Sequence, residues 1–409
     1  MSSGSADESP PPPGPAGGRA AMTTPHESAS PPRPVPVPVP GRTLGVEEEF
    51  LLVDAGTRRI AGLAGAVIER ARRTPPPAPD AVLQRELSAA QIEAATGVTT
   101  DLPELVRQLD GARRTLAAAA RAEGGRLVST GLPVLDGAAP VTGGERFTAI
   151  ARLYEHQAAS YLACGCHVHV GVPDPETAVA VVNWLRPWLP TLLALSANSP
   201  WDRGRDSGYA SWRVMEQARF PGSGIPPRFG SAAEHAAEVA RLVECGVLVD
   251  PRMTFWLARP SPHLPTVEVR VADALGTTWE TALQAALTRA LVSTALADLA
   301  AGREAPPVPA QLASAALWTA ARFGLDGPAV DPVHETRVPA RALLDRLLAH
   351  LAPALEAAGD LPFVRGALSA LHRHGTGAAR QRHAGAPSGP AAAVDMLAAQ
   401  TDGALAPGG

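Results

Sequence analysis

Three adjacent glutamates, Glu47 to Glu49, interrupt an apolar segment at residues 43–53 that has the pattern of a β-strand. Side chains alternate between the two faces of a strand, so Glu47 and Glu49 share one face at a separation of about 7 Å. That spacing suits two carboxylates that share or flank divalent cations. Glu48 points the other way, and the sequence assigns it no role. A solvated edge strand with an acidic patch would show the same pattern.

Two histidines follow the same alternation in the segment Cys-Gly-Cys-His-Val-His-Val-Gly at residues 164–171. His167 and His169 fall on one face, whereas Cys164 and Cys166 fall with the valines on the other. The spacing of the four resembles a zinc cluster, but one strand cannot aim all of them at a single ion. We therefore expect the cysteines to be small core residues. For the histidines, a metal site and a structural role both stay open.

A third strand is predicted at residues 266–273, where valines form one face and Thr266, Glu268 and Arg270 form the other. The acid and the arginine could form an ordinary surface ion pair. Beside bound metal and phosphate they would divide the work, with Glu268 on the cation and Arg270 on the anion. Each of the three strands has one apolar face and one face with candidate ligands. This is the pattern of a curved sheet whose open face is an active site.

The elements that must position these strands are mixed helices and strands without a regular βαβ alternation, which favours the α+β class. Helices are predicted at residues 101–123, 231–246, 282–301 and 341–358, and a short strand at 127–130. Residues 1–40 are rich in proline and predict a disordered arm. One folded domain is expected at residues 41–395, followed by a flexible C-terminal tail at 396–409.

Composition excludes several kinds of chemistry. All 36 cationic side chains are arginines, so a Walker-type phosphate loop and Schiff-base chemistry on lysine are both excluded. The net charge of −4 gives no global basic field for nucleic acid or an acidic membrane. The sequence shows no secretory signal and no uninterrupted apolar run long enough to span a membrane. We expect a cytoplasmic protein that binds neither nucleic acid nor membrane.

The segments at residues 43–50, 165–171, 195–200 and 266–271 resemble the carboxylate–amine ligase family, also called glutamate–cysteine ligase type 2. Further similar segments occur in the family's order at residues 205–213, 220–227, 321–327 and 377–382. The resemblance implies a glutamine-synthetase-like catalytic domain, in which a curved antiparallel sheet has helices packed on one face.

The resemblance also implies a site. Arg270 would contact phosphate, and Glu268 and Arg270 would be the catalytic pair. Hard carboxylate oxygens with one imidazole suit Mg²⁺ or Mn²⁺ better than zinc. The implied metal ligands are Glu47, Glu49, Glu86, Glu93, His167 and Glu268. The candidate substrate or phosphate contacts are Arg213, Arg322, Arg380 and Arg382, for each of which a structural salt bridge is an equal alternative.

The sequence also predicts the chain geometry around Glu86 and Glu93 and the effect of replacing Glu268. Glu86 and Glu93 are seven residues apart, which is an opposite-face spacing on a strand, so a bend or bulge is needed between them. Replacing Glu268 with glutamine is expected to abolish turnover with little loss of folding, because a ligand on an open face would support little core.

The implied reaction is ATP-dependent. The γ-carboxylate of L-glutamate would attack the γ-phosphate of ATP, and the amine of L-cysteine would displace phosphate from the resulting acyl phosphate. The implied partners are small-molecule substrates, and the oligomeric state stays open, with a homodimer among the alternatives. Two other readings remain: a metal-dependent hydrolase built on the His-x-His strand, and a non-catalytic nucleotide-binding protein.

Overall fold

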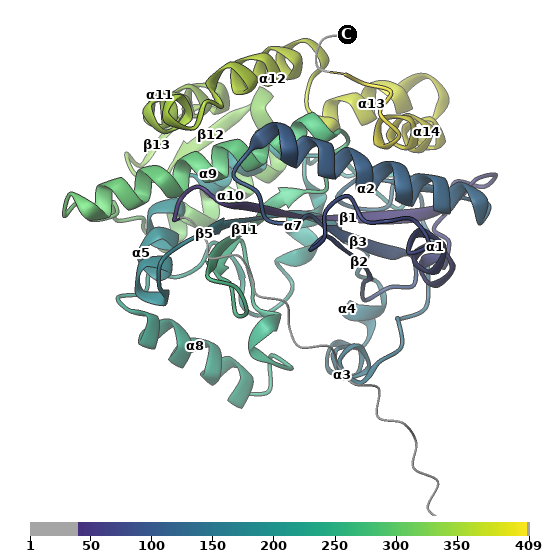
Figure 1. Cartoon of the computed structure of the whole chain (residues 1–409), viewed down its shortest axis with the longest axis horizontal. Coiled ribbons are helices and arrows are strands. Elements are labelled where there is room, and N and C mark those ends of the chain that lie inside the picture. The colour runs from purple at the N-terminus through teal and green to yellow at the C-terminus, as the bar shows by residue number, and fades with distance from the viewer. Residues whose placement is uncertain (1–39, 407–409) are drawn as a thin grey trace, which may run out of the picture. The chain divides into compact units, whose positions relative to one another are not determined.

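A seven-stranded antiparallel sheet runs through the centre of the computed structural model, which describes residues 40–406 (Figure 1). The strand order is β10-β11-β5-β1-β3-β2, and β4 pairs with a further part of β1. The mixture of this sheet with helices confirms the predicted α+β class. The strands are β1 (Leu44–Asp54), β2 (Val82–Arg85), β3 (Gln91–Ala95), β4 (Gly125–Val128), β5 (Gly165–Gly171), β10 (Ala258–Pro260) and β11 (Thr266–Asp273).

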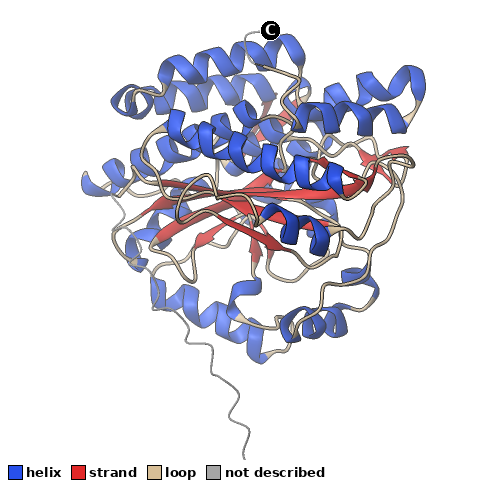
Figure 2. Cartoon of the chain, turned by 45° about the vertical axis from the view of Figure 1, so that its right-hand side comes forward, coloured by secondary structure: helices blue, strands red, loops and turns tan. Residues whose placement is uncertain are grey.

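One face of the sheet is covered by long helices, and further helices pack on top of them (Figures 1 and 2). The covering helices are α1 (Ala64–Ala71), α2 (Leu102–Ala122), α5 (Pro175–Leu185), α6 (Leu189–Ser196) and α9 (Thr278–Ala300). The outer helices are α10 (Ala310–Phe323), α11 (Ala340–Ala358), α12 (Leu361–His374), α13 (Gly377–Ser388) and α14 (Pro390–Thr401).

The other face of the sheet is overhung by shorter elements, with α3, α4 and α8 below it in Figure 1. These helices are α3 (Glu145–Tyr154), α4 (His156–Ala159), α7 (Trp212–Gln217) and α8 (Ala232–Glu244). Short strands in the connecting segments are β6 (Trp201–Asp202), β7 (Arg205–Asp206), β8 (Ser223–Gly224) and β9 (Phe255–Trp256). Two more, β12 (Pro328–Asp331) and β13 (Thr336–Pro339), pair with each other beside α10 and α11 on the helix-covered side. Single 3₁₀ turns occupy Pro251–Met253 and Gly324–Asp326.

The main hydrophobic core lies on the helix-covered face. Val46, Val168 and Val269, from three neighbouring strands, are buried there against apolar residues of α2, α5, α6 and α9. Cys166 is buried in the same cluster and Cys164 in a smaller one, so the prediction that both are core residues is confirmed. The opposite faces of the same strands are thereby left for the polar side chains.

Helix α9 is buried on nearly all sides because it lies between the sheet and the outer helices α11 and α12. It begins four residues before the predicted start at residue 282, at a capping box in which Thr277 and Glu280 each accept a hydrogen bond from the other's backbone N–H. The predictions at 101–123, 231–246 and 341–358 correspond to α2, α8 and α11.

The folded part of the chain extends further than the sequence predicted. The expected tail at residues 396–409 is wrong at its start, because α14 continues to Thr401 and buries Leu397, Ala398 and Thr401. The proline-rich arm expected at residues 1–40 lies almost wholly outside the described residues, as do residues 407–409.

Within residues 40–406, no single helix has the length and apolar character needed to cross a membrane. Helices α5 and α6 meet that criterion only when taken together, and they are bent by 67° at the break between them. Both contribute buried residues to the main core.

Candidate active site

Cross-strand register gathers the polar side chains on the open face of the sheet. Glu47 of β1 stands directly opposite His167 of β5, and His169 of β5 stands opposite Glu268 of β11. Residues directly opposite one another in an antiparallel pair place their side chains on the same face. Segments far apart in the sequence thus converge at one place.

Glu47, His169 and Glu268 form a first cluster, in which one potential ligand atom from each lies within 4.8 Å of the others. The Nδ1 atom of His169 is 2.9 Å from the Thr266 hydroxyl, which fixes the ring. Its Nε2 atom is buried, has no hydrogen-bond partner among the described residues, and lies 3.4 Å from a Glu47 oxygen. Two carboxylates and a fixed imidazole with a free nitrogen fit a divalent cation.

Glu49, Glu86 and Glu93 form a second cluster, whose carboxylate oxygens also lie within 4.8 Å of one another. Glu49 stands opposite Glu93 in the pairing of β1 with β3. Glu86 follows the end of β2, and the chain reverses between it and β3. The bend expected between Glu86 and Glu93 is therefore a hairpin connection, which confirms that expectation.

Burial and mutual repulsion together raise the pKa of two of the three carboxylates in the second cluster. Burial, followed by the neighbouring Glu49 carboxylate, raises the pKa of Glu86 to about 7. Burial and the charge of Glu47 raise the pKa of Glu93 well above its ordinary value. A divalent cation bound here would stabilise three acids crowded in this way, because its charge would offset both the burial and the mutual repulsion.

In the first cluster, neighbouring histidines and arginines stabilise the charged form of the two carboxylates. Burial by itself raises the pKa of Glu47, but the hydrogen bond from His167 and the neighbouring His169 ring outweigh it, and the pKa falls well below its ordinary value. Burial likewise raises the pKa of Glu268, and the charges of Arg270 and Arg259 more than reverse this effect. Both carboxylates are therefore ionised at neutral pH.

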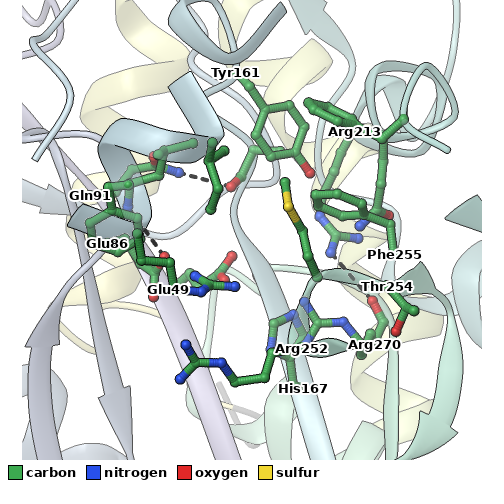
Figure 3. Close-up of a pocket in the computed structure, with 18 residues that line it drawn as sticks. Glu49, Glu86, Gln91, Tyr161, His167, Arg213, Arg252, Thr254, Phe255 and Arg270 are labelled. Atoms are coloured by element: carbon green, nitrogen blue, oxygen red, sulfur yellow. Dashed lines mark hydrogen bonds between the residues drawn. The ribbon is translucent and has the colours of Figure 1, made fainter. Parts of the chain in front are cut away.

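Two arginines present guanidinium groups to the hollow beside these clusters (Figure 3). Arg270 forms an ion pair with Glu268, and its Nη1 atom lies 3.3 Å from Nδ1 of His167. Arg213 is buried, and its Nη2 donates a hydrogen bond of 3.3 Å to the backbone carbonyl of Arg270. Planar guanidinium groups in this arrangement suit the oxygens of a carboxylate or a phosphate.

A buried carboxylate, Asp273, holds the segment that carries Arg213. It accepts hydrogen bonds from the Asn198 backbone N–H at 2.8 Å, from the Ser199 hydroxyl at 2.7 Å and from the Ser211 hydroxyl at 2.9 Å. The nearest Arg213 nitrogen is 3.8 Å from the same carboxylate. The polar residues in the segments at 195–200 and 205–213 therefore support the site from behind.

Gly165 is required where β5 passes Arg213. Its backbone N–H donates a hydrogen bond of 2.5 Å to Glu49. A Cβ atom at this position would overlap the Arg213 guanidinium and approach the His167 ring to 3.0 Å. The absent side chain thus leaves room for the arginine at the pocket.

The pocket at this site has a volume of about 150 Å³ and is lined by Glu49 and Glu86 of the second cluster together with His167, Arg213 and Arg270 (Figure 3). Two further lining arginines, Arg146 and Arg252, share the Asp250 carboxylate at 2.6 and 3.4 Å. Aromatic residues form another part of the wall, namely Phe147, Tyr161, Phe220 and Phe255. The pocket therefore combines anionic, cationic and apolar surfaces.

Three of the predicted substrate contacts are not brought to this pocket. Arg380 is buried against Glu280 at 2.8 Å, and Arg382 pairs with Asp206 at 2.7 Å. Arg322 donates to a backbone carbonyl and lies over two aromatic rings. At these positions the alternative of a structural contact is the one that the geometry supports, and only Arg213 of the four lines the pocket.

Sequence reasoning chose His167 as the metal ligand, whereas the structure groups His169 with the two carboxylates of the first cluster. The signal for His169 was its alternation with His167, but only the register shows that it faces Glu268. Arg259 was missed entirely. It pairs with Glu268 at 2.7 Å across neighbouring strands, and nothing in its local sequence indicates that contact.

Comparison with known proteins shows the family to which the chain belongs. The model of glutamate–cysteine ligase family 2 matches residues 43–393, and the chain belongs to this family. It is 58% identical over 364 residues to a Saccharopolyspora erythraea protein named "Putative glutamate--cysteine ligase 2-2", covering 88% of this chain and 93% of that protein. A Nocardia farcinica protein named "Putative glutamate--cysteine ligase 2-1" is 46% identical over 367 residues, which cover 89% of this chain and 94% of that protein.

Solved structures confirm the predicted glutamine-synthetase-like fold. A bifunctional glutathione synthetase from Pasteurella multocida superposes with a TM-score of 0.64 at 15% identity, covering 88% of this chain and 52% of that one. Glutamate–cysteine ligase from Francisella tularensis, solved in complex with AMP, gives a TM-score of 0.56 at 12% identity, with 90% of each chain covered.

Proposed function

We propose that this protein is an ATP- and Mg²⁺-dependent carboxylate–amine ligase that joins the γ-carboxylate of L-glutamate to the amine of L-cysteine. The observation that carries the proposal is the pair of clusters on the open face of β1, with Arg270 and Arg213 beside them. Oxygen-rich sites of this kind suit Mg²⁺ or Mn²⁺, and guanidinium groups beside them suit transferred phosphate.

Each cluster would hold a divalent cation. Glu47, His169 and Glu268 would bind one, and the three acids Glu49, Glu86 and Glu93 would bind another. A cation bound there supplies positive charge that offsets the charge of phosphate oxygens.

The arginines handle the anionic groups. In the first step, an oxygen of the substrate carboxylate bonds to the γ-phosphorus of ATP, and the bond from that phosphorus to ADP breaks. Arg270 and Arg213 donate hydrogen bonds to the oxygens on which charge accumulates. In the second step, the amine nitrogen bonds to the acyl carbon, loses a proton, and phosphate leaves. Neither step needs a lysine, which agrees with the arginine-only composition.

Support for the substrates comes from the relatives. Their names carry glutamate and cysteine, and the Francisella ligase was solved with AMP, which supports the use of a nucleotide by a chain of this fold. Small-molecule substrates in a cytoplasmic setting belong to the same proposal, and a homodimer remains compatible with it.

The test is ADP release by the purified protein with Mg²⁺-ATP and glutamate, with and without cysteine, and with products identified by mass. ADP that depends on both substrates, together with a γ-glutamylcysteine mass, is the expected result. Glu49→Gln should abolish it, whereas the matched control Glu104→Gln, at a half-buried acid of α2 that pairs with Arg107, should not.

Other outcomes have distinct meanings. ADP release with glutamate alone would support the acyl-phosphate step and reject cysteine as the acceptor. Hydrolysis that is indifferent to ATP would reject the ligase in favour of a metal-dependent hydrolase. Saturable ATP binding without turnover on any amine would favour a non-catalytic nucleotide-binding protein.

A further inference from the structure

Arg259 is a buried arginine that stands opposite Glu268 in the pairing of β10 with β11. Arg259 does not line the pocket itself. It contacts Glu268, which belongs to the first cluster, and the segment at residues 252–254, which lines the pocket. Its five hydrogen bonds therefore connect two parts of the site from behind.

One side of the guanidinium group holds the carboxylate of Glu268. The Nε atom donates to Oε2 at 2.7 Å, and Nη2 donates to Oε1 at 3.3 Å. A two-point contact between planar groups fixes the rotation of the carboxylate as well as its position. Arg270 contacts Oε1 of the same carboxylate from the pocket side.

The remaining nitrogen of Arg259 holds the pocket wall. Nη1 donates to the backbone carbonyls of Arg252 and Thr254, both at 2.8 Å, and to the Thr254 hydroxyl at 3.0 Å. Arg252, Met253 and Thr254 all line the pocket. One rigid side chain thus joins a candidate metal ligand to the wall that substrate would touch.

We propose that Arg259 is a positioning residue, which orients the Glu268 carboxylate for a divalent cation and ties that orientation to the pocket wall at residues 252–254. The inference rests on the proposed function, in that the first cluster holds a cation. Charge alone does not account for the contacts, because a lysine ammonium would neutralise Glu268 but could not hold both the carboxylate and the wall.

Arg259→Lys in the full chain is the direct test, with Mn²⁺ alone as the probe. When the unaltered protein is titrated with Mn²⁺ and free Mn²⁺ is measured by electron paramagnetic resonance, we expect two classes of binding site, one at each cluster. In Arg259→Lys one class should weaken about 10- to 100-fold, the usual effect of removing a group that orients a metal ligand. The other class, at the three-acid cluster, should be unchanged.

A second variant, Thr254→Val, tests the same contacts if Arg259→Lys does not fold. Thr254→Val removes one hydrogen bond at the wall and leaves the carboxylate contact, so the same class of site should weaken by roughly three- to tenfold. The matched control is Arg113→Lys, which alters a buried arginine–glutamate pair on the opposite face of the sheet. It should lower thermal stability and leave the Mn²⁺ affinity of the folded protein unchanged.

The outcomes separate this inference from the proposed function. Folded Arg259→Lys, verified by circular dichroism, with the Mn²⁺ affinity of the unaltered protein would overturn the inference. An unchanged affinity in Thr254→Val would overturn the link to the wall. Absence of Mn²⁺ binding by the unaltered protein would overturn both proposals. Mn²⁺ binding that depends on Arg259, without any ligase product, supports the inference and rejects only the proposed substrates.

Discussion

Glu48 and Arg113 form a buried ion pair of 2.6 Å on the helix-covered side of β1, whereas the neighbouring Glu47 and Glu49 lie on the open side. The Thr281 hydroxyl of α9 donates a further hydrogen bond of 2.6 Å to Glu48. The acidic triplet is therefore divided by the alternation of one strand. Its outer members face the candidate metal sites, and its middle member joins the sheet to α2 and α9.

Glu48→Gln should destabilise the fold without altering the site. Breaking a buried pair leaves an uncompensated charge on Arg113, which costs about 3–5 kcal/mol. Urea denaturation should show this loss, while the folded variant retains the Mn²⁺ affinity of the unaltered protein. A loss of Mn²⁺ binding without a loss of stability would place Glu48 in the site instead.

Glu86→Gln should have the opposite effect on stability in the metal-free protein. The raised pKa means that folded Glu86 keeps its proton up to about pH 7, whereas the unfolded chain releases it near its ordinary value. The unaltered protein therefore loses stability as pH rises through this window, and the glutamine variant loses less because it lacks the contribution of Glu86.

In chelator, Glu86→Gln should accordingly be more stable than the unaltered protein at pH 8, by about 1–3 kcal/mol, and equally stable at pH 4. Thermal melts at the two pH values provide the measurement. Mn²⁺ should stabilise the unaltered protein more than the variant. Equal stability at pH 8 would show that the three acids do not repel one another as their geometry implies.

Arg270→Lys should lower kcat about 100-fold while the fold is retained. The substitution keeps a positive charge but removes the planar pair of donors that reaches the pocket. Single-turnover measurements of ADP formation would isolate the chemical step. Arg382→Lys, at an exposed pair with Asp206, is the matched control and should keep full activity. A kcat equal to that of the control would remove Arg270 from the reacting groups.

Gly165→Ala should displace the Arg213 guanidinium, since the new Cβ would overlap it. We expect kcat/KM to fall about 100-fold, the order of loss that accompanies a displacement of 1 Å in a catalytic group. Gly65→Ala is the control, because a Cβ on this residue of α1 meets no atom within 4 Å. If both variants have the same activity, Arg213 does not need its present position.

Glu268→Gln should cost stability as well as turnover, contrary to the expectation from the sequence. Glu268 is buried and pairs with both Arg259 and Arg270. Removing its charge leaves two cations facing one neutral amide, at a cost of about 3–5 kcal/mol. Circular dichroism melts of the variant provide the check, and an unchanged melting temperature would contradict the pairing.

The central strands were predictable because alternation is a local property. The strand around Glu47 and the one around His167 each carry their apolar and polar faces in consecutive residues. Register between strands is not local, which is why the sequence favoured His167 and could not show that His169 faces Glu268. The same holds for Glu86, which a hairpin brings to the second cluster.

The arginines were harder to place, because their partners are distant in the sequence. Arg380 pairs with a glutamate one hundred residues earlier, and Arg113 with one 65 residues earlier. A long cationic side chain has no periodic signature, so its role depends on which carboxylate the folded chain brings within reach. The sequence offered Arg213, Arg322 and Arg380 alike as candidate substrate contacts, but of these three only Arg213 lines the pocket, and the other two make structural contacts.

Every cation that lines the pocket is a guanidinium group, and the chain contains no lysine at all. An acyl phosphate transfers its acyl group to any unprotonated primary amine that it meets. For a ligase that passes through such an intermediate, a lysine in the pocket would compete with the acceptor and end in self-acylation. Arginine holds the same anions, yet it stays protonated at any physiological pH and offers no nucleophile. Such a ligase would therefore have no lysine amine in its pocket to compete with the acceptor.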